Sequence, residues 1–142
     1  MAMTDDLPPP CVGSRARKRI LIVEDNDLNM RLLNDVLEAH GYDTLQTDQG
    51  EIAVDLARRF HPDLILMDLQ LPDISGLEAT RRLKANESTR SIPIVAVTAF
   101  AMSGDERKAR DSGCDGYIAK PIMLQQFLAT VARFVGGAVA SL

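Results

Sequence analysis

The stretch Asp63-Leu64-Ile65-Leu66-Met67-Asp68 decides the fold class. Its four consecutive apolar residues predict a strand buried on both faces, as in a parallel sheet covered by helices. Asp68 stands at the carboxyl end of this strand, where ligands bind in open α/β sheets. A carboxylate there must be solvated, paired or bound to a metal, because an isolated buried charge is very costly. Asp68 is therefore the candidate for the chemistry, and we expect the rest of the chain to supply its partners.

On both sides of this stretch, apolar patterns alternate between strand and helix spacing. The alternation predicts a doubly wound α/β domain with a five-stranded parallel sheet and five helices. Strands are predicted at 20–23, 42–47, 63–68, 92–97 and 117–119, and helices at about 28–40, 50–60, 76–85, between 103 and 113, and at 124–135.

Two of the predicted helices carry specific expectations. The first has an apolar stripe that we expect to face the core, formed by Leu28, Leu32 and Val36 and widened by Leu33 and Leu37. The fourth is signalled by Ser103 and Glu106 at the spacing of a capping box. Residues 105–111 are nearly all polar, so little apolar area anchors that helix.

Composition limits the classes of function. The chain has 142 residues, which suits one domain, and a formal net charge of −4, which argues against nucleic acid as a partner. No apolar run approaches the roughly 18 residues of a membrane span, and the start lacks a signal-peptide pattern. We therefore expect a cytoplasmic protein with no membrane insertion. In that compartment Cys11 and Cys114 should be free thiols.

The two ends of the chain read as tails around one domain. Residues 1–17 contain a proline run and little apolar periodicity, which predicts a flexible N-terminal tail. The domain is expected over 18–136 and a C-terminal tail over 137–142. A basic cluster where the N-terminal tail meets the domain is either a solvated flank or a docking site for an acidic partner; it comprises Arg15, Arg17, Lys18 and Arg19.

Side chains that suit phosphoryl chemistry stand at the ends of four predicted strands. They are Glu24 and Asp25 after the first strand, Asp68 at the end of the third, Thr98 after the fourth and Lys120 after the fifth. Parallel strands place their carboxyl ends at one edge of a sheet, so we expect these side chains to converge. Three carboxylates so close would raise one another's pKa unless a cation neutralised them. Mg²⁺ is the natural candidate, since it takes hard oxygen ligands and accepts carboxylates together with a phosphate.

The remaining residues then favour phosphorylation of Asp68. Lys120 offers a compact positive charge to a phosphoryl oxygen, and Thr98 offers a hydroxyl hydrogen bond. Asp68 can then act as a nucleophile and form an aspartyl phosphate.

Taken singly, each residue has a purely structural interpretation. Glu24 and Asp25 suit the positive end of the first helix dipole, and Asp68 alone is an ordinary loop residue. Thr98 alone favours a strand, and Lys120 alone is a surface lysine. The conjunction of these residue types at the ends of four strands is far more specific than any one member.

The arrangement resembles the receiver domain of bacterial response regulators over about residues 18–136. The residues that carry the resemblance are Leu21-Ile22-Val23-Glu24-Asp25, Leu66-Met67-Asp68 with Leu71-Pro72 and Gly76, Val97-Thr98-Ala99, and Tyr117-Ile118-Ala119-Lys120-Pro121. The amino-acid sequences of segments 23–30 and 97–102 are most similar to those of the small DivK-type regulators of cell division.

The resemblance implies a fold and a set of site residues. The fold is flavodoxin-like, with strand order 2-1-3-4-5. Glu24, Asp25 and Asp68 bind Mg²⁺ with the backbone carbonyl of Gln70, and Asp68 accepts the phosphoryl group. Thr98 and Lys120 contact that group. Further implied features are a switch aromatic at Tyr117, a cis peptide before Pro121, and an influence of Gln70 and Phe100 on dephosphorylation.

The resemblance also implies partners. A single-domain response regulator receives phosphate from a sensor histidine kinase or a histidine phosphotransfer protein. Its downstream protein targets bind through the face formed by the fourth helix, the last strand and the last helix. Such a protein is not an enzyme beyond slow self-dephosphorylation, and cell-cycle or cell-division control is its expected role.

Two other classes of function fit this sequence less well. A nucleotide- or flavin-binding module would need a glycine-rich first loop, but here acids follow the first strand. A magnesium-dependent phosphohydrolase with an aspartate nucleophile commonly has a second acid two residues later, and Gln70 cannot serve as one.

Three polar residues are expected to have structural roles only. His40 and His61 lie at predicted helix ends, where a cation suits the helix dipole. Asp73 lies in a polar loop and is expected to be solvated.

Overall fold

The computed structural model describes residues 17–71, 73–98 and 105–135. Within them, five parallel strands form one sheet in the order β2-β1-β3-β4-β5, so the predicted fold class and strand order are confirmed. The strands are β1 (Arg19–Val23), β2 (Asp43–Thr47), β3 (Leu64–Asp68), β4 (Ile94–Thr98) and β5 (Gly116–Ala119). The helices are α1 (Asp27–Ala39), α2 (Gly50–Phe60), α3 (Gly76–Ala85), α4 (Asp105–Ser112) and α5 (Leu124–Val135).

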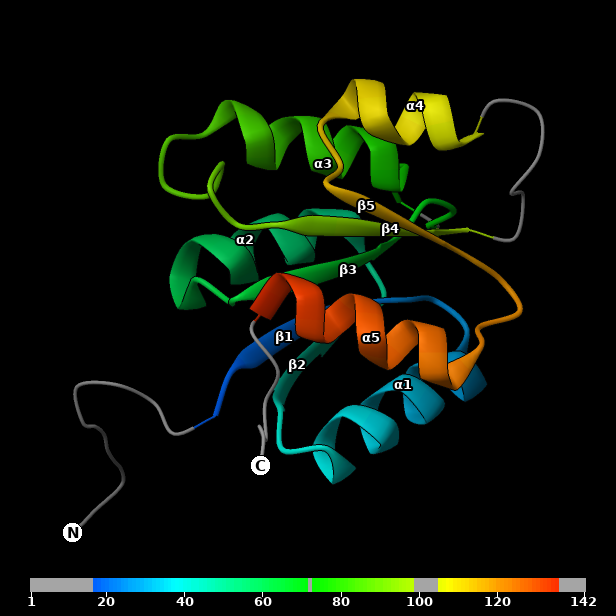
Figure 1. Ribbon diagram of the computed structural model, residues 1–142. Coiled ribbons are helices and arrows are strands. Elements are labelled where there is room, and N and C mark those ends of the chain that lie inside the picture. The colour runs from blue at the N-terminus through cyan, green and yellow to red at the C-terminus, as the bar shows by residue number, and fades with distance from the viewer. Residues whose placement is uncertain (1–16, 72, 99–104, 136–142) are drawn as a thin grey trace, which may run out of the picture.

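Helices cover both faces of the sheet (Figure 1). α1 and α5 share one core cluster with the sheet, α2 and α3 share another, and α4 lies against α3 and β5. Successive residues of β1 point to opposite faces. Ile20 and Ile22 therefore pack with α1 and α5, whereas Leu21 and Val23 pack with α2 and α3.

The central strand β3 carries the phosphoacceptor candidate to one edge of the sheet. All five of its residues are buried, as the apolar run predicted. β1 and β4 flank it, with Met67 opposite Val23 and Asp68 opposite Val97. Asp68 thus lies at the centre of the edge formed by the carboxyl ends of the strands.

The predicted core-facing stripe of the first helix is confirmed at Leu33, Leu37 and Val36 and is wrong at Leu28 and Leu32. Leu33 and Leu37 are fully buried, whereas Leu28 is 76% exposed and Leu32 is 41% exposed. The leucines of α1 spread over more than one face of the helix. Packing against the sheet, where Leu33 and Leu37 join the core cluster that includes Ile20 and Ile22, therefore decides which of them reach the core, and hydrophobic spacing alone does not.

The other differences in element boundaries are small. β4 begins at Ile94 and includes Thr98, whereas 92–97 was predicted. Pro93 cannot donate to the sheet, and the ladder extends instead to the pair of Thr98 and Ala119. His40 and His61 occupy the C-cap positions of α1 and α2, in agreement with their structural interpretation.

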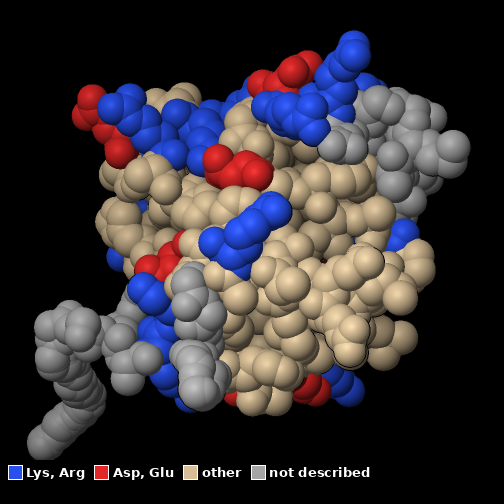
Figure 2. Space-filling view, in the orientation of Figure 1, with Lys and Arg blue, Asp and Glu red and all other residues tan. Residues whose placement is uncertain are grey.

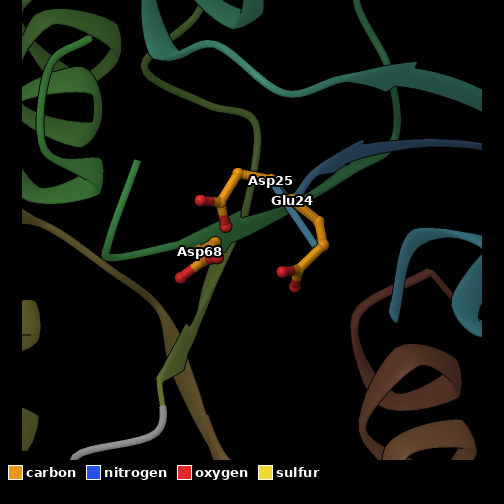
Figure 3. Close-up of side chains that lie close together, drawn as sticks. All are labelled: Glu24, Asp25 and Asp68. Carbon is orange, nitrogen blue, oxygen red and sulfur yellow. The ribbon is translucent and has the colours of Figure 1, made fainter. Parts of the chain in front are cut away.

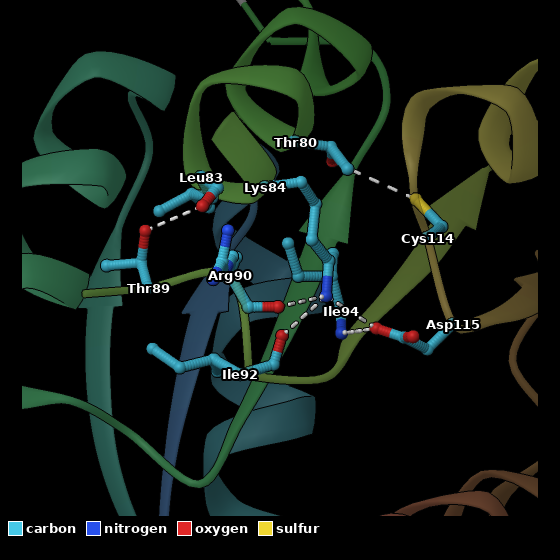
Figure 4. Close-up of polar contacts among 9 residues, drawn as sticks. All are labelled: Thr80, Leu83, Lys84, Thr89, Arg90, Ile92, Ile94, Cys114 and Asp115. Carbon is cyan, nitrogen blue, oxygen red and sulfur yellow. Dashed lines mark hydrogen bonds and ion pairs between the residues drawn. The ribbon is translucent and has the colours of Figure 1, made fainter. Parts of the chain in front are cut away.

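A polar network anchors the opposite edge of the sheet (Figure 4). The Nζ of Lys84 donates to the carbonyls of Arg90 (3.1 Å) and Ile92 (2.9 Å) and to Oδ2 of Asp115 (2.9 Å). The same Asp115 oxygen accepts the backbone N–H of Ile94 at 2.9 Å. The network therefore ties the end of α3 to the starts of β4 and β5.

Several sequence expectations concern the ends of the chain or segments beyond the described residues. The proposed tails 1–17 and 137–142, Cys11, Phe100 and Ser103 lie there, apart from Arg17. Arg17 donates to the carbonyl of Gly41 at 3.0 Å. Cys114 is a free, half-buried thiol. Among the described helices, none combines the length and apolar character needed to cross a membrane.

Candidate phosphoacceptor and metal site

Three carboxylates gather at the carboxyl edge of the sheet (Figure 3). Glu24 and Asp25 directly follow β1 and Asp68 ends β3, so the pairing of these two strands brings them together. Each offers one carboxylate oxygen to a group whose members all lie within 4.8 Å of one another. Glu24 and Asp68 are buried, and Asp25 is exposed.

Among the described residues, Lys120 is the cation that forms ion pairs with this cluster. Its Nζ lies 3.3 Å from Oε2 of Glu24 and 3.5 Å from Oδ2 of Asp68. Lys120 follows β5, and its backbone N–H donates to the carbonyl of Thr98 at 2.7 Å. The Lys120–Pro121 peptide is cis, as the resemblance implied.

One lysine does not balance three acids. Burial raises the pKa of Asp68, and the charge of Glu24 adds to this, while the Gln70 N–H and Lys120 act in the opposite direction. The pKa of Asp25 is also raised, by partial burial and by the charge of Asp68. The site therefore has an excess of negative charge on hard oxygen atoms, which is the donor set that Mg²⁺ prefers.

The two oxygens of Asp68 have different surroundings. Oδ1 accepts the backbone N–H of Gln70 at 2.9 Å, and Oδ2 faces Lys120. The following loop folds closely over the strand end, since the N–H of Gly76 donates to the carbonyl of Leu69 at 3.1 Å. A Cβ at Gly76 would lie 2.2 Å from the carbonyl oxygen of Asp68, so only glycine fits there.

Thr98 and Tyr117 lie on one face of the sheet, on neighbouring strands. Thr98 is fully buried at the end of β4, opposite Ala119. Tyr117 pairs with Ala96 in the same register and packs with Ala96 and Ala109 of α4. Since residues two apart on a strand share a face, Thr98 and Tyr117 are diagonal neighbours on the face covered by α4.

Asp73 is exposed, as predicted, but it also makes a contact that the sequence did not indicate. Although exposed, its carboxylate accepts the N–H groups of Gly50 and Glu51, both at 2.9 Å, at the start of α2. The sequence shows a loop aspartate but not the distant helix end that it binds. Only the fold reveals this contact.

Comparison with known proteins defines the class. The family model of the response regulator receiver domain matches residues 20–132. This chain belongs to the response regulator receiver domain family, whose members act in two-component signalling and are generally not catalytic enzymes. Among curated proteins it is similar to the polar-differentiation response regulator DivK of Brucella ovis. The two are 55% identical over 121 residues, which cover 85% of this chain and 98% of that protein.

Two solved structures bear on the site. The receiver domain of the sensor histidine kinase PA1611 from Pseudomonas aeruginosa PAO1 has a magnesium ion coordinated in its active site cleft. It is 36% identical, with a TM-score of 0.80 over 85% of this chain and 99% of that one. A chain of the complex between the Saccharomyces cerevisiae histidine phosphotransfer protein Ypd1 and the receiver domain of Ssk1 is 32% identical. Its TM-score is 0.79 over 88% of this chain and 94% of that one.

Proposed function

We propose that this protein accepts a phosphoryl group on Asp68 from a histidine kinase, directly or through a histidine phosphotransfer protein. The observation that carries the proposal is the convergence of Glu24, Asp25 and Asp68 with Lys120 at one edge of the sheet. The PA1611 receiver domain, with magnesium in its active site cleft, and the Ypd1–Ssk1 complex support it.

In this proposal Glu24, Asp25, Asp68 and the backbone carbonyl of Gln70 hold Mg²⁺. The ion supplies charge neutralisation for the incoming phosphoryl group. A carboxylate oxygen of Asp68 attacks phosphorus, and an O–P bond forms as the P–N bond to the donor histidine breaks. The electron pair of that bond returns to the imidazole nitrogen. Lys120 and Thr98 contact the phosphoryl oxygens and stabilise their charge.

Exposed apolar side chains next to the site suit the phosphodonor. Leu28 lies three residues after Asp25, and Met123 lies three residues after Lys120. Leu28 is 76% exposed and Met123 is 61% exposed, and both belong to segments that pack on the same face of the sheet. We place the contact with the donor on this donor surface, defined by Leu28, Leu32, Met123 and Leu124.

The output is proposed to leave through α4, β5 and α5. A groove between β5 and α5 is lined by Tyr117, Lys120, Met123 and Gln126, among others. Figure 2 shows few charged side chains over the start of α5 and many basic ones over α3 and α4. When Thr98 moves to bind the phosphoryl group, Tyr117 can turn into the space, and the poorly anchored α4 can shift.

The biological role is proposed from the relatives. The similarity to DivK proteins supports cell-cycle or cell-division control in the cytoplasm. The unit responsible is the domain over 18–136 with its flanking tails 1–17 and 137–142. Self-dephosphorylation should be slow, since Gln70 stands where an aspartate-nucleophile phosphohydrolase would have an acid.

One experiment separates the phosphoacceptor from the phosphohydrolase. Wild type and Asp68→Asn are incubated with Mg²⁺ and a small-molecule phosphodonor. We expect a base-labile phosphoryl label on Asp68 of the wild type and none on the variant. Absence of labelling in the wild type, or continuous turnover of the donor, would contradict the proposal.

A further inference from the structure

The loop between β3 and α3, which the structure describes at 69–71 and 73–75, carries Gln70. Backbone hydrogen bonds hold both of its ends. Leu69 donates to the carbonyl of Val97 at 3.1 Å, and Gly76 donates to the carbonyl of Leu69 at 3.1 Å. The N–H of Gln70 also donates to Oδ1 of Asp68 at 2.9 Å, so the direction of the Gln70 carbonyl depends on how the residues after it are held.

Asp73 attaches the middle of this loop to α2. Its Oδ1 accepts the N–H of Gly50 and its Oδ2 accepts the N–H of Glu51. Slight burial of Asp73 acts to raise its pKa, but the bonds from Glu51 and Gly50 outweigh this and lower the pKa, so the carboxylate stays ionised. The N-cap residue of α2, Gln49, makes no side-chain capping bond within the described structure. Asp73 thus supplies from another loop the cap that α2 lacks.

A second contact joins the same two segments independently of charge. A Cβ at Gly50 would lie 2.6 Å from Cγ1 of Ile74 and 3.3 Å from its carbonyl oxygen. Ile74 packs against the core cluster shared by α2 and α3. The loop is therefore seated directly on the first turn of α2, and only glycine at position 50 allows this approach.

We propose that Asp73 is a positioning residue for the metal site. Mg²⁺ demands near-ideal octahedral geometry, so a carbonyl ligand must be held in place before the ion binds. By fixing the loop on α2, Asp73 holds the Gln70 carbonyl toward Glu24, Asp25 and Asp68. The inference rests on the proposed function, because it concerns the same magnesium site.

The test compares the dissociation constant of Mg²⁺, measured by isothermal titration calorimetry, in matched variants. In Asp73→Ala we expect a rise of about 3- to 10-fold, at or below the roughly 10–100-fold typical of groups that orient metal ligands. Asp73→Asn keeps one oxygen for capping and should recover part of the affinity. Asp48→Asn removes the same charge two residues before α2, outside this contact, and should bind Mg²⁺ as the wild type does.

Gly50→Ala tests the positioning without any change of charge. It should also weaken Mg²⁺ binding, because the new Cβ displaces Ile74 and the loop. Amide hydrogen exchange at Gly50 and Glu51 should accelerate in Asp73→Ala, which shows that the cap is lost.

Three outcomes would overturn the inference. The first is a wild-type Mg²⁺ affinity in folded Asp73→Ala, even with a lowered melting temperature. The second is equal weakening by Asp73→Ala and Asp48→Asn, which would show that only charge matters. The third, a wild type that binds no Mg²⁺, would overturn the proposed metal site as well.

Discussion

The fold disfavours the ionised form of the Asp68 carboxyl. The pKa of its carboxyl is raised by burial and by Glu24, so the folded protein retains that proton to higher pH than the unfolded chain does. Between the two pKa values the unfolded chain binds fewer protons, and stability falls as pH rises through this window. Above the folded-state pKa the whole penalty is present.

Replacing Asp68 should therefore stabilise the metal-free protein. For Asp68→Asn at pH 7 in EDTA, we expect the free energy of unfolding in urea to rise by about 1 kcal/mol, a common size for a single substitution. Mg²⁺ should stabilise the wild type, by about 1.4 kcal/mol at tenfold excess over its dissociation constant, and the variant much less. An Asp68→Asn protein less stable than the wild type in EDTA would contradict this reading of the site.

The close approach of the backbone to Gly76 predicts that a larger residue there destabilises the fold. In Gly76→Ala the new Cβ would meet the backbone of Asp68 and Leu69, at 2.2 Å and 2.7 Å, and backbone cannot move aside as a flexible side chain can. We expect a loss of about 2–3 kcal/mol in urea unfolding. Ser75→Ala, one residue earlier, removes only the N-cap bond to Glu78 and should cost about 1 kcal/mol. Equal losses in the two variants would show that the close approach is unimportant.

At the residue scale, the sequence predicts the location of those side chains that stand at the ends of strands. Glu24, Asp25, Asp68 and Lys120 were expected to converge because parallel strands end at one edge. The contact of Asp73 with the start of α2 was not predicted, because the two lie 22 to 23 residues apart in the chain and no sequence pattern links them.

At the scale of elements, α4 should be the most easily opened helix. Among its described side chains, Ala109 is the apolar one in a core cluster, whereas α5 buries Phe127, Val131 and Val135. Amide hydrogen exchange should therefore be faster across 105–112 than across 124–135. Comparable protection of the two helices from hydrogen exchange would contradict the idea that little free energy is needed to displace α4.

Lys84 should contribute more to stability than a surface lysine. It donates to three acceptors (Figure 4), and its loss leaves Asp115 without its cation. For Lys84→Met we expect a loss of about 2 kcal/mol in urea unfolding. Arg82→Met, on the same helix, breaks only an exposed ion pair with Glu78 and should cost under about 1 kcal/mol. Similar losses in both variants would show that the network is dispensable.

Element boundaries were predictable where one local signal dominates. Helices α2 and α3 match the predicted 50–60 and 76–85, since Pro62 follows the first and a capping serine precedes the second. The rotation of α1 was not predictable. Its leucines could form more than one stripe, and the orientation observed follows from how the helix packs on the sheet.

At the scale of the whole molecule, the donor surface should matter for protein donors only. In Leu28→Ser we expect phosphoryl transfer from a phosphorylated histidine donor that labels the wild type to slow several-fold, because apolar contact area is lost. Labelling by a small-molecule phosphodonor should not change. Phe60→Ser is the control, since Phe60 is 43% exposed at the far end of α2. Equal slowing with both kinds of donor would place the defect in the site itself.

The fold as a whole was predictable because each strand and crossover helix has its own local signature. The apolar run of β3 indicates a parallel sheet, and the alternation of strands with helices indicates the α/β fold class. Local sequence patterns do not predict tertiary contacts, such as which leucines of α1 face the core and which loop caps α2.

The contact between Lys120 and Glu24 spans 96 residues. One partner directly follows the first strand, and the other follows the last. A nascent chain therefore carries its acids long before the lysine and the edge strand β5 emerge, and long-range contacts form late in folding. Under the proposed function, phosphorylation of Asp68 therefore requires a fully synthesised and folded domain, and truncated or half-folded chains should not be labelled by a phosphodonor.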